Sequence, residues 1–401
     1  MNDRREILFL AHRIPYPPDK GDKIRSWRLV EHLAKSWRVH LAAFVDDPAN
    51  FVHEDFLETV CESVHLVRLR PFEARLKSAA GFLTGEPLTF PYYRHAEMIR
   101  HVKALRARDL AFEFAFSSSM APYLEKSHEG RPRFIDLCDA DSEKWRAYGK
   151  ARAGLMAGVY TREADSLAKA EARILNWADA AFAVSDAEAS IFNSHADVLR
   201  KALVLPNGVD ANYFSPAGLE GEKGAAEVVF IGAMDYAPNV DAALWFAGEV
   251  WPLVRARAPE ARFAIIGPRP SREILGLESA GGVRVTGRVA DVRPWLAAAR
   301  VVIAPLRIAR GVQNKVLEAM AMGRPVVATS TANAGIEARR DEEILIADEA
   351  AAFAAEVAGL LADPQRGGKL GAAARARVIA DFGWPAQFGK LDAAIASVLS
   401  R

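Results

Sequence analysis

The sequence lacks the features that mark membrane-spanning, disulfide-bonded and nucleic-acid-binding proteins. No apolar run approaches the roughly 20 residues that a membrane span needs. The two cysteines, Cys61 and Cys138, are too few and too far apart for a disulfide framework or a zinc site. The formal net charge of +1 provides no overall field for nucleic acid. We therefore expect a cytoplasmic protein that meets a membrane, if at all, peripherally.

The sequence also lacks the glycine fingerprint of nicotinamide-dependent oxidoreductases. Those enzymes carry G-x-G-x-x-G directly after a first strand and an acidic residue about 20 positions later. Neither half of this chain opens in that way. Solenoid repeats and low-complexity tracts are missing as well. An oxidoreductase and a repeat protein are therefore disfavoured.

What the chain does contain is two series of short apolar runs that alternate with helical stretches. At 401 residues it exceeds the size of one hydrophobic core. The first series fills residues 1–205 and the second fills residues 225–384, with a linker at residues 206–224 that has an Asn-Gly turn. Alternation of this kind predicts an α/β protein with two doubly wound, Rossmann-like domains facing each other across a cleft. We expect a last helix, residues 385–401, to pack back on the first domain.

The strongest chemical signal is a loop-to-helix segment in the second domain. A loop with Arg307 and Arg310 follows a predicted strand, and a helix is predicted to begin near Val312. The free amides of a helix N-terminus can bind a diphosphate. Lys315 and Glu318 share one face of this helix. A glutamate so placed can accept hydrogen bonds from both hydroxyls of a ribose, which favours a nucleotide-sugar site over an exposed ion pair.

Five stretches spread over nearly the whole chain carry a resemblance to a known family: PYPPDKGDKIR, LPNGVDANYF, VVFIGAMDYAPN, VTGRVADVRPWL and KVLEAMAMGRPVVAT. They resemble retaining glycosyltransferases of family 4, which have the GT-B fold of two Rossmann-like domains. IDLCDADSEKW and RGVQNKVLEAMAMGRPVV further resemble the exosortase (PEP-CTERM)-associated exopolysaccharide subgroup. The resemblance implies a hexosyltransferase-like enzyme of exopolysaccharide biosynthesis. Its donor would be a UDP- or GDP-sugar, and its acceptor a glycan or a polyprenyl-linked molecule.

The same resemblance implies roles for particular residues. Glu318 would bind the ribose of the donor. Amides at Gly311, Val312 and Gln313 would meet the diphosphate. Gly21, in the first loop, would let the backbone approach the donor closely.

The chain departs from the family pattern in two places. Arg310 stands where the family often has a Glu that contacts the transferred sugar, which makes Arg310 a candidate catalytic residue. The stretch GAMDYAPN lacks the Arg and Lys that often follow the first strand of the second domain. The diphosphate charge must then be met by other cations, for which Arg288, Arg307, Arg310 and Lys315 are available. Arg288 is equally well explained as a solvent-facing loop cation.

Acidic residues follow a predicted strand of the first domain at Asp136, Asp139 and Asp141. Asp139 and Asp141 could together hold a divalent cation, but two carboxylates alone are a weak metal signal. We therefore predict no metal and no other cofactor. Asp139 is a candidate catalytic residue that orients the acceptor or the sugar, whereas Asp141 could cap a helix. No protein base is assigned, because in this family the donor phosphate itself can take the acceptor proton.

Residues 68–108 are rich in Lys and Arg, with aromatic and aliphatic residues between them. Such a surface can dock on the anionic inner face of the cytoplasmic membrane, but it is equally typical of a solvated helical face. The alternative to an enzyme is a non-catalytic nucleotide-sugar-binding or scaffold protein of a polysaccharide assembly system. Arg310 in place of a Glu supports that alternative, and the donor-site pattern around Glu318 opposes it.

Overall fold

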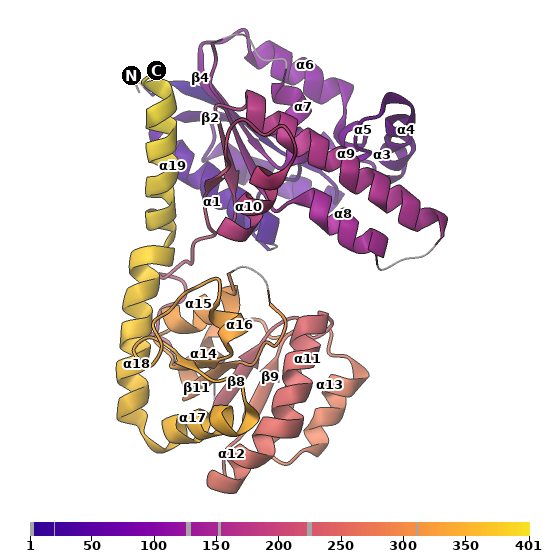
Figure 1. The fold of residues 1–401 in the computed structure, drawn as a ribbon. Helices are drawn as coiled ribbons and strands as arrows, with labels where there is room; N and C mark the ends of the chain where they lie inside the picture. Colours follow the sequence, from indigo (N-terminus) through magenta and orange to yellow (C-terminus); the bar gives the residue numbers. More distant parts are fainter. Residues whose placement is uncertain (1–3, 20, 126–129, 151–153, 223–226, 310–311) are drawn as a thin grey trace. The chain divides into compact units, whose positions relative to one another are not determined.

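The computed structural model describes residues 4–19, 21–125, 130–150, 154–222, 227–309 and 312–401. Contacts divide the chain into two compact units, shown in Figure 1. Unit 1 comprises Met1–Asn207 and Phe388–Arg401, and unit 2 comprises Gly208–Gln387. Each unit is built on one parallel sheet, so the predicted α/β class with two doubly wound domains is confirmed.

The sheet of unit 1 has the strand order β3-β2-β1-β4-β5-β6-β7, and its runs of buried apolar residues are typical of a parallel sheet covered on both faces. Its strands are β1 (Glu6–Ala11), β2 (Arg38–Val45), β3 (Ser63–Arg68), β4 (Leu110–Phe116), β5 (Arg133–Cys138), β6 (Ala180–Ala183) and β7 (Leu203–Val204). The order reverses between β1 and β4. In doubly wound sheets the ligand crevice opens at such a switch point, beyond the carboxyl ends of the strands.

Helices cover both faces of this sheet. They are α1 (Gly21–Ser36), α2 (Glu54–Glu58), α3 (Pro71–Ser78), α4 (Ala80–Thr84), α5 (Thr89–Tyr93), α6 (Ala96–Leu105), α7 (Ala121–Leu124), α8 (Asp141–Lys150), α9 (Leu155–Trp177) and α10 (Asp186–Ser194). The amphipathic helix α6 buries Met98 and Val102 in the same core as Phe44 of the sheet. On α1, His32 stacks on Phe388 of α19 (Trp384–Leu399) with ring centroids 4.0 Å apart. The longest of these helices, α9, has 23 residues.

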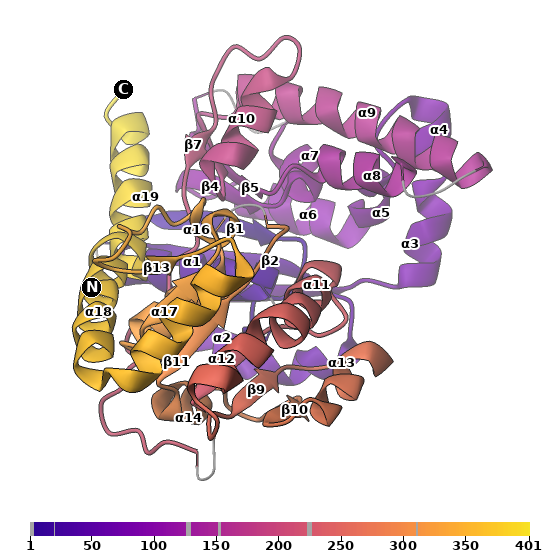
Figure 2. The same ribbon diagram turned by 60° about the horizontal axis from the view of Figure 1, so that its bottom comes forward.

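The sheet of unit 2 has the order β10-β9-β8-β11-β12-β13. Its strands are β8 (Val228–Ile231), β9 (Phe263–Ile266), β10 (Val283–Gly287), β11 (Val301–Ala304), β12 (Val326–Ala328) and β13 (Leu345–Ile346). Its helices are α11 (Ala237–Trp245), α12 (Trp251–Arg257), α13 (Arg272–Gly276), α14 (Arg293–Ala298), α15 (Asn314–Ala321), α16 (Ser330–Asn333), α17 (Ala350–Ala362) and α18 (Pro364–Arg377). Figure 2 shows α17 beside α12, and both contribute apolar residues to one core with the strands.

Glycines let the loops at the carboxyl edge of the second sheet approach one another. A Cβ on Gly267, after β9, would lie 1.7 Å from the carbonyl oxygen of Gly232, after β8. A Cβ on Gly232 would lie 2.6 Å from the side chain of Asn239. Side chains at these two positions would therefore push apart the loops that border the edge.

Two details differ from the sequence-based expectations. Helix α15 begins at Asn314 rather than near Val312, because Gln313 has the extended dihedral angles of an N-cap (φ −90°, ψ 96°). The segment expected to be a linker, residues 206–224, packs on unit 2: Arg375 donates to the carbonyl of Phe214 at 2.9 Å, and Arg293 lies 3.8 Å from the ring centroid of Tyr213. Within the described ranges, no helix is long and apolar enough to cross a membrane.

Candidate functional site

Helix α15 presents Lys315 and Glu318 from its first turns, directly after the loop that leaves β11. Its apolar residues, among them Val316 and Leu317, are buried in the core of unit 2, whereas Lys315 and Glu318 are only half-buried. The predicted division of this helix into two faces is thus confirmed. Among the described residues, the Glu318 carboxylate accepts no hydrogen bond from a protein donor, so both of its oxygens remain available to a ligand.

The two charged groups have shifted pKa values. Burial raises the pKa of Glu318 to about 7, and the Lys315 charge only partly opposes this. Burial also lowers the pKa of Lys315 to about 8. A carboxyl group whose pKa is this high exchanges its proton at neutral pH, and perturbed values of this kind cluster at binding and catalytic sites.

Lys315 reaches across to β8 and to the first turn of α11, the helix that follows it. Its Nζ donates to Oδ1 of Asn239 and lies 5.2 Å from the ring centroid of Phe230. The Asn239 side chain in turn donates to the carbonyl of Ala233 at 3.0 Å, which fixes its orientation. Lys315 therefore brings a positive charge to the start of α11, beside the stretch GAMDYAPN, which has no cation of its own.

The arginines predicted to meet the diphosphate have different surroundings. Arg307 pairs with Asp241 of α11, with Nε and Oδ2 3.0 Å apart, so its guanidinium already has an anionic partner. Arg288 directly follows β10 and is exposed, with no ion pair among the described residues. Arg310, the predicted catalytic residue of this loop, lies outside the described residues, as does Gly311.

The remaining predicted donor contacts flank helix N-termini. Val312 is half-buried against the core of unit 2, and the carbonyl of Gln313 accepts from the amides of Val316 and Leu317 at 2.9 and 3.2 Å. In unit 1, Gly21 is the first residue of α1 and is exposed. A Cβ built on Gly21 meets nothing within 4 Å, so the fold itself does not require glycine there.

A buried ion pair shapes the carboxyl end of β5. Asp136 is completely buried, and Oδ2 accepts from Nε of Arg25 on α1 at 2.8 Å. Oδ1 accepts from the amide of Cys138 at 3.0 Å, and Cys138 takes a left-handed conformation with φ 59°. Asp139, the predicted acceptor-side residue, follows this turn with its side chain exposed. The neighbouring protein still removes part of its hydration, which raises the pKa of Asp139.

Asp141 lies at the start of α8, where it accepts a hydrogen bond from Ser118 Oγ at 2.9 Å. Burial raises the pKa of this carboxyl group, and the Ser118 hydrogen bond opposes that shift. In the part of the chain that the structure describes, no group of three or more His, Cys, Asp or Glu side chains is arranged to hold a metal ion. The pair of Asp139 and Asp141 thus gains no third ligand of these types from the described residues.

A second polar cluster lies at the switch point, and sequence reasoning did not assign it. His12 directly follows β1, and its Nε2 lies 3.5 Å from Oδ2 of Asp22. Burial alone would raise the pKa of Asp22, but the His12 hydrogen bond and the Arg13 charge hold it well below its usual value. The Nδ1 atom of His12 is buried and has no partner among the described residues. The signal that could have revealed the cluster is polar residues placed directly after the first buried strand.

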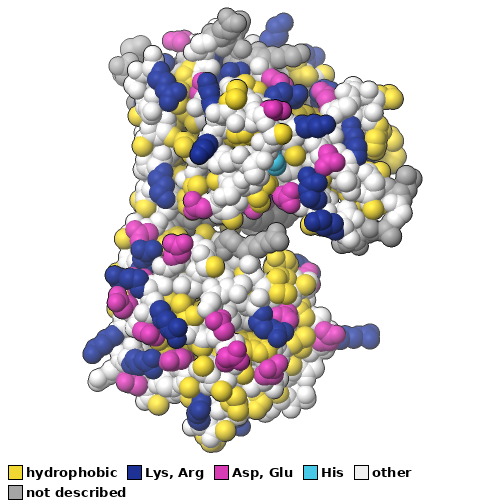
Figure 3. Space-filling view, viewed as in Figure 1, with side chains coloured by type: hydrophobic (Ala, Val, Ile, Leu, Met, Phe, Trp, Pro, Cys, Tyr) yellow, Lys and Arg dark blue, Asp and Glu magenta, His cyan; other side chains and the backbone are white. Residues whose placement is uncertain are grey.

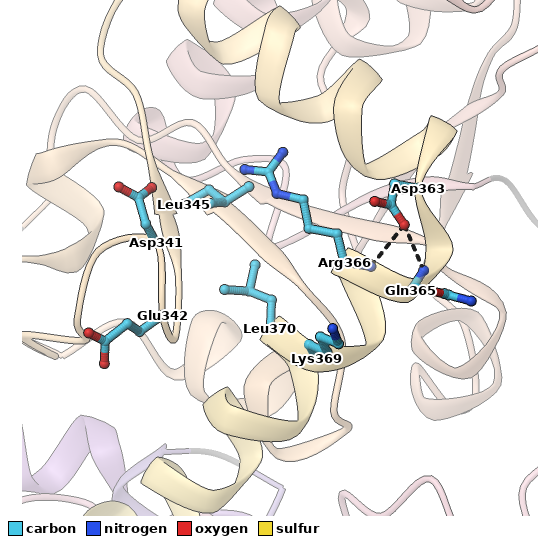
Figure 4. A pocket seen from close by; sticks show the side chains of 8 residues that line it. All are labelled: Asp341, Glu342, Leu345, Asp363, Gln365, Arg366, Lys369 and Leu370. Atoms are coloured by element: carbon cyan, nitrogen blue, oxygen red, sulfur yellow. Dashed lines mark hydrogen bonds between the residues drawn. The ribbon is translucent and has the colours of Figure 1, made fainter.

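A separate pocket lies on unit 2 away from this edge. Figure 4 shows Asp341 and Glu342 on one side of it and Arg366 and Lys369 of α18 on the other. Asp341 and Glu342 precede β13, so they lie at the amino end of that strand rather than at its carboxyl end. Acidic and basic side chains both line the pocket, and none of the predicted site residues does.

Comparison with known proteins places part of unit 2 in a family of glycosyltransferases. Residues 225–363 match the family model of the glycosyl transferases group 1. A phosphatidyl-myo-inositol mannosyltransferase of Propionibacterium freudenreichii subsp. shermanii is 30% identical over 177 residues, which are 43% of this chain and 44% of the relative. The matched part thus spans less than half the length of that curated relative.

Solved structures match over nearly the whole chain. HepE of Anabaena, solved with UDP, has a TM-score of 0.65 at 16% identity, covering 98% of this chain and all of the other. Sucrose-phosphate synthase of Thermosynechococcus elongatus has a TM-score of 0.65 at 17% identity, covering 99% of this chain and all of the other. The chain therefore has the GT-B glycosyltransferase fold, and within it residues 225–363 form a region of the glycosyl transferases group 1 type.

Proposed function

We propose that the protein is a retaining glycosyltransferase of family 4 that moves a sugar from a UDP- or GDP-sugar to a glycan or lipid-linked acceptor. The observation that carries the proposal is the Glu318 carboxylate, which is half-buried in the first turns of α15 and lacks a protein hydrogen-bond donor among the described residues. A partly buried carboxylate has given up part of its hydration and gains from donors that replace it. The two hydroxyls of a ribose would supply the missing donors.

The charge of the donor diphosphate would be met at the same edge of unit 2. We propose that backbone amides at the N-terminus of α15, together with those near Gly311 to Gln313, meet the diphosphate. Lys315 places its cation at the first turn of α11, beside the segment after β8 in which related enzymes often have theirs, and we propose that it replaces them. Arg288 is exposed close to the carboxyl end of β10 and is a second candidate. Arg307 would contribute only if its ion pair with Asp241 opened.

In unit 1 we propose that Asp139 orients the acceptor or the sugar and that the backbone at Gly21 approaches the donor closely. We also propose that Arg310 contacts the transferred sugar. HepE has been solved with UDP and with UDP-glucose, and the mannosyltransferase relative has phosphatidyl-myo-inositol in its name. These names support a nucleotide-sugar donor and a lipid-linked acceptor. We further propose a role in exopolysaccharide biosynthesis, in the exosortase-associated subgroup, at the cytoplasmic face of the membrane with contact through residues 68–108.

The direct test is thermal unfolding of the purified chain with UDP, GDP and CDP and their common sugar conjugates, with and without EDTA. A ligand at 100 times its dissociation constant adds about 2.7 kcal/mol to stability, which gives a clear shift. We expect stabilisation by one nucleotide that persists in EDTA. If no nucleotide stabilises the chain, the donor-site proposal fails. Stabilisation without any transfer or donor hydrolysis would instead favour a non-catalytic nucleotide-sugar-binding protein.

Nucleotide affinity should depend on pH in a way set by Glu318 and Lys315. Below pH 7 the Glu318 carboxyl is mostly protonated and must lose its proton to accept two hydrogen bonds, so affinity should fall up to tenfold for each pH unit below 7. Above pH 8 Lys315 loses its charge, which should weaken UDP binding again. Calorimetric titrations with UDP from pH 5.5 to 9 should therefore show an optimum between about 7 and 8.

The matched control is Glu318→Gln in the same pH series. The amide does not titrate, so the acidic limb should become shallower and keep only the part that comes from protonation of the UDP phosphates, while the alkaline limb stays. The phosphates of UDP titrate equally with both proteins and cancel in the comparison. An acidic limb of unchanged slope in Glu318→Gln would show that Glu318 is not the group that titrates.

A further inference from the structure

Four large hydrophobic side chains are exposed together on α3 and α4 of unit 1. Phe72 and Leu76 are 75% and 64% exposed on α3, and Phe82 and Leu83 are 52% and 92% exposed on α4. We call these four residues the α3–α4 surface. Figure 3 shows hydrophobic side chains gathered over these helices at the edge of unit 1. Single exposed apolar residues need no explanation, but a contiguous group indicates a partner.

The exposure does not come from a loosely attached segment. On α3, Ala74 is buried on the opposite side from Phe72 and Leu76, and Ser78 Oγ donates to the carbonyl of Leu88 at 2.7 Å. The following residues are held by α9: Glu163 accepts from the amides of Leu88 and Thr89 at 2.6 and 3.1 Å. The inner side of this region is thus fixed, and its apolar side faces solvent.

A cation from α9 also holds α4. Arg162 donates to the carbonyl of Gly81, and its guanidinium lies 5.2 Å from the ring centroid of Phe82. Gly81 is buried, and a Cβ there would lie 3.0 Å from both the Glu86 carbonyl oxygen and the Leu88 side chain. The backbone of α4 is therefore closely packed on its buried side, whereas the side chains of Phe82 and Leu83 are exposed to solvent.

The charges around the surface are predominantly positive. Glu73 is neutralised by Arg70 at 2.8 Å, and Glu86 is neutralised by Arg94 at 3.0 Å. Arg75 and Lys77, which lie in the last turn of α3, are exposed and form no ion pair within the described ranges. Apolar side chains flanked by unpaired cations complement the acyl chains and the anionic headgroups of a lipid leaflet.

Helix α6, in the same basic segment, does not offer such a surface. Its apolar side, with Met98, Val102 and Leu105, is buried in the core of unit 1. Its exposed side carries Arg100 and Lys103, together with the large apolar side chain of Ile99, which is 47% exposed. The larger apolar surface in residues 68–108 therefore lies on α3 and α4.

We propose that the α3–α4 surface inserts into an anionic lipid leaflet, with Phe72, Leu76, Phe82 and Leu83 among the acyl chains and Arg75 and Lys77 at the headgroups. This inference rests on the proposed function in one respect: docking would serve to bring unit 1 to a lipid-linked acceptor. The docking itself depends on the surface alone and can be tested without any substrate.

The test is co-sedimentation of the full chain with phosphatidylcholine vesicles that contain about 30% phosphatidylglycerol. Replacing Phe72, Leu76, Phe82 and Leu83 with serine should lower the partition coefficient at least about a hundredfold, since each fully buried side chain contributes roughly tenfold. The control replaces two other exposed apolar residues of unit 1, Val52→Ser and Leu199→Ser, which are 75% and 84% exposed. The control should bind vesicles as the unchanged chain does.

Insertion is measured separately with an environment-sensitive fluorophore on Leu83→Cys, since Cys61 is buried and burial raises the pKa values of both native thiols. Its emission should shift to the blue on vesicle binding, whereas the same label on Val52→Cys should not respond. Vesicle binding that is absent, or unaffected by the serine substitutions, overturns the proposal. So does a concentration-dependent dimer that the serine substitutions abolish while vesicles are not bound, because the occupant is then a second copy of this chain.

The failure of docking and the failure of the proposed function can be told apart. Stabilisation by UDP is measured on the same protein samples and reports on unit 2. A chain that UDP stabilises but that ignores vesicles contradicts the lipid inference alone. A chain that binds vesicles through Leu83 but ignores every nucleotide contradicts the donor-site proposal alone.

Discussion

Replacing Asp136 with alanine should lower the free energy of unfolding by about 3–5 kcal/mol, because it leaves the buried guanidinium of Arg25 without its charge partner. The Arg25 side chain is 3% exposed and also donates to the Leu205 carbonyl at 2.7 Å and to Asn207 Oδ1 at 3.0 Å, so it cannot turn to solvent without breaking those bonds. Calorimetry of the full chain should show one transition lowered by about 10 °C.

Two further variants separate the ion pair from other effects. Arg25→Met with Asp136→Leu replaces both charges with apolar groups and should be more stable than either single variant. Glu73→Ala breaks the exposed pair with Arg70 and should leave the unfolding temperature unchanged. A double variant that is destabilised by the sum of the two single effects would show that the pair is not coupled.

The same network also determines where Asp139 lies. Because Asp136 holds the amide of Cys138, loss of its carboxylate frees the left-handed turn that precedes Asp139. Asp139→Ala should instead leave stability nearly unchanged, since its side chain is exposed. Transfer activity of the two variants is therefore compared at a temperature at which both are folded. This comparison distinguishes a positioning role for Asp136 from a direct role for Asp139.

The strands were predictable from the sequence because each is a short apolar run bounded by turn residues. Runs such as EILFLA and RVHLAAFV are short and nearly continuous in apolar residues, which is typical of buried parallel strands, and both are found as strands. The start of α15 was misplaced by two residues, since Gln313 can continue a helix or cap it and only its dihedral angles decide. The local sequence pattern therefore predicts whether a segment is a strand or a helix more reliably than it predicts the residues at which the segment begins and ends.

The partners of the site residues were not predictable, because they depend on topology rather than on local pattern. Arg25 and Asp136 meet only because β1 and β5 both end at the same edge of one sheet with α1 beside them. The pairing of Arg307 with Asp241 likewise needs β8 and β11 to be neighbours. A sequence shows that cations are present near a predicted site, but it does not show which of them already have an anion beside them.

Glu318→Ala and Lys315→Met should weaken nucleotide binding in different ways, which can be resolved with uridine, UMP and UDP. If Glu318 binds the ribose, its loss removes charge-assisted hydrogen bonds that all three ligands share, so each should bind about 10–100-fold more weakly. If Lys315 meets the diphosphate, Lys315→Met should weaken the binding of UDP by a similar factor and leave the binding of uridine unchanged. The methionine keeps an apolar side chain over Phe230.

The matched control for the loss of a lysine charge is Lys369→Met, an exposed residue of the pocket near the amino end of β13. It removes the same charge from the same unit, and because it lies away from the donor edge it should leave the binding of all three ligands unchanged. If Lys315→Met weakens the binding of uridine as much as the binding of UDP, Lys315 acts through the structure of α15 and not on the phosphates. If Glu318→Ala leaves uridine binding intact, the ribose contact lies elsewhere, and the missing hydrogen bonds of the Glu318 carboxylate need another ligand.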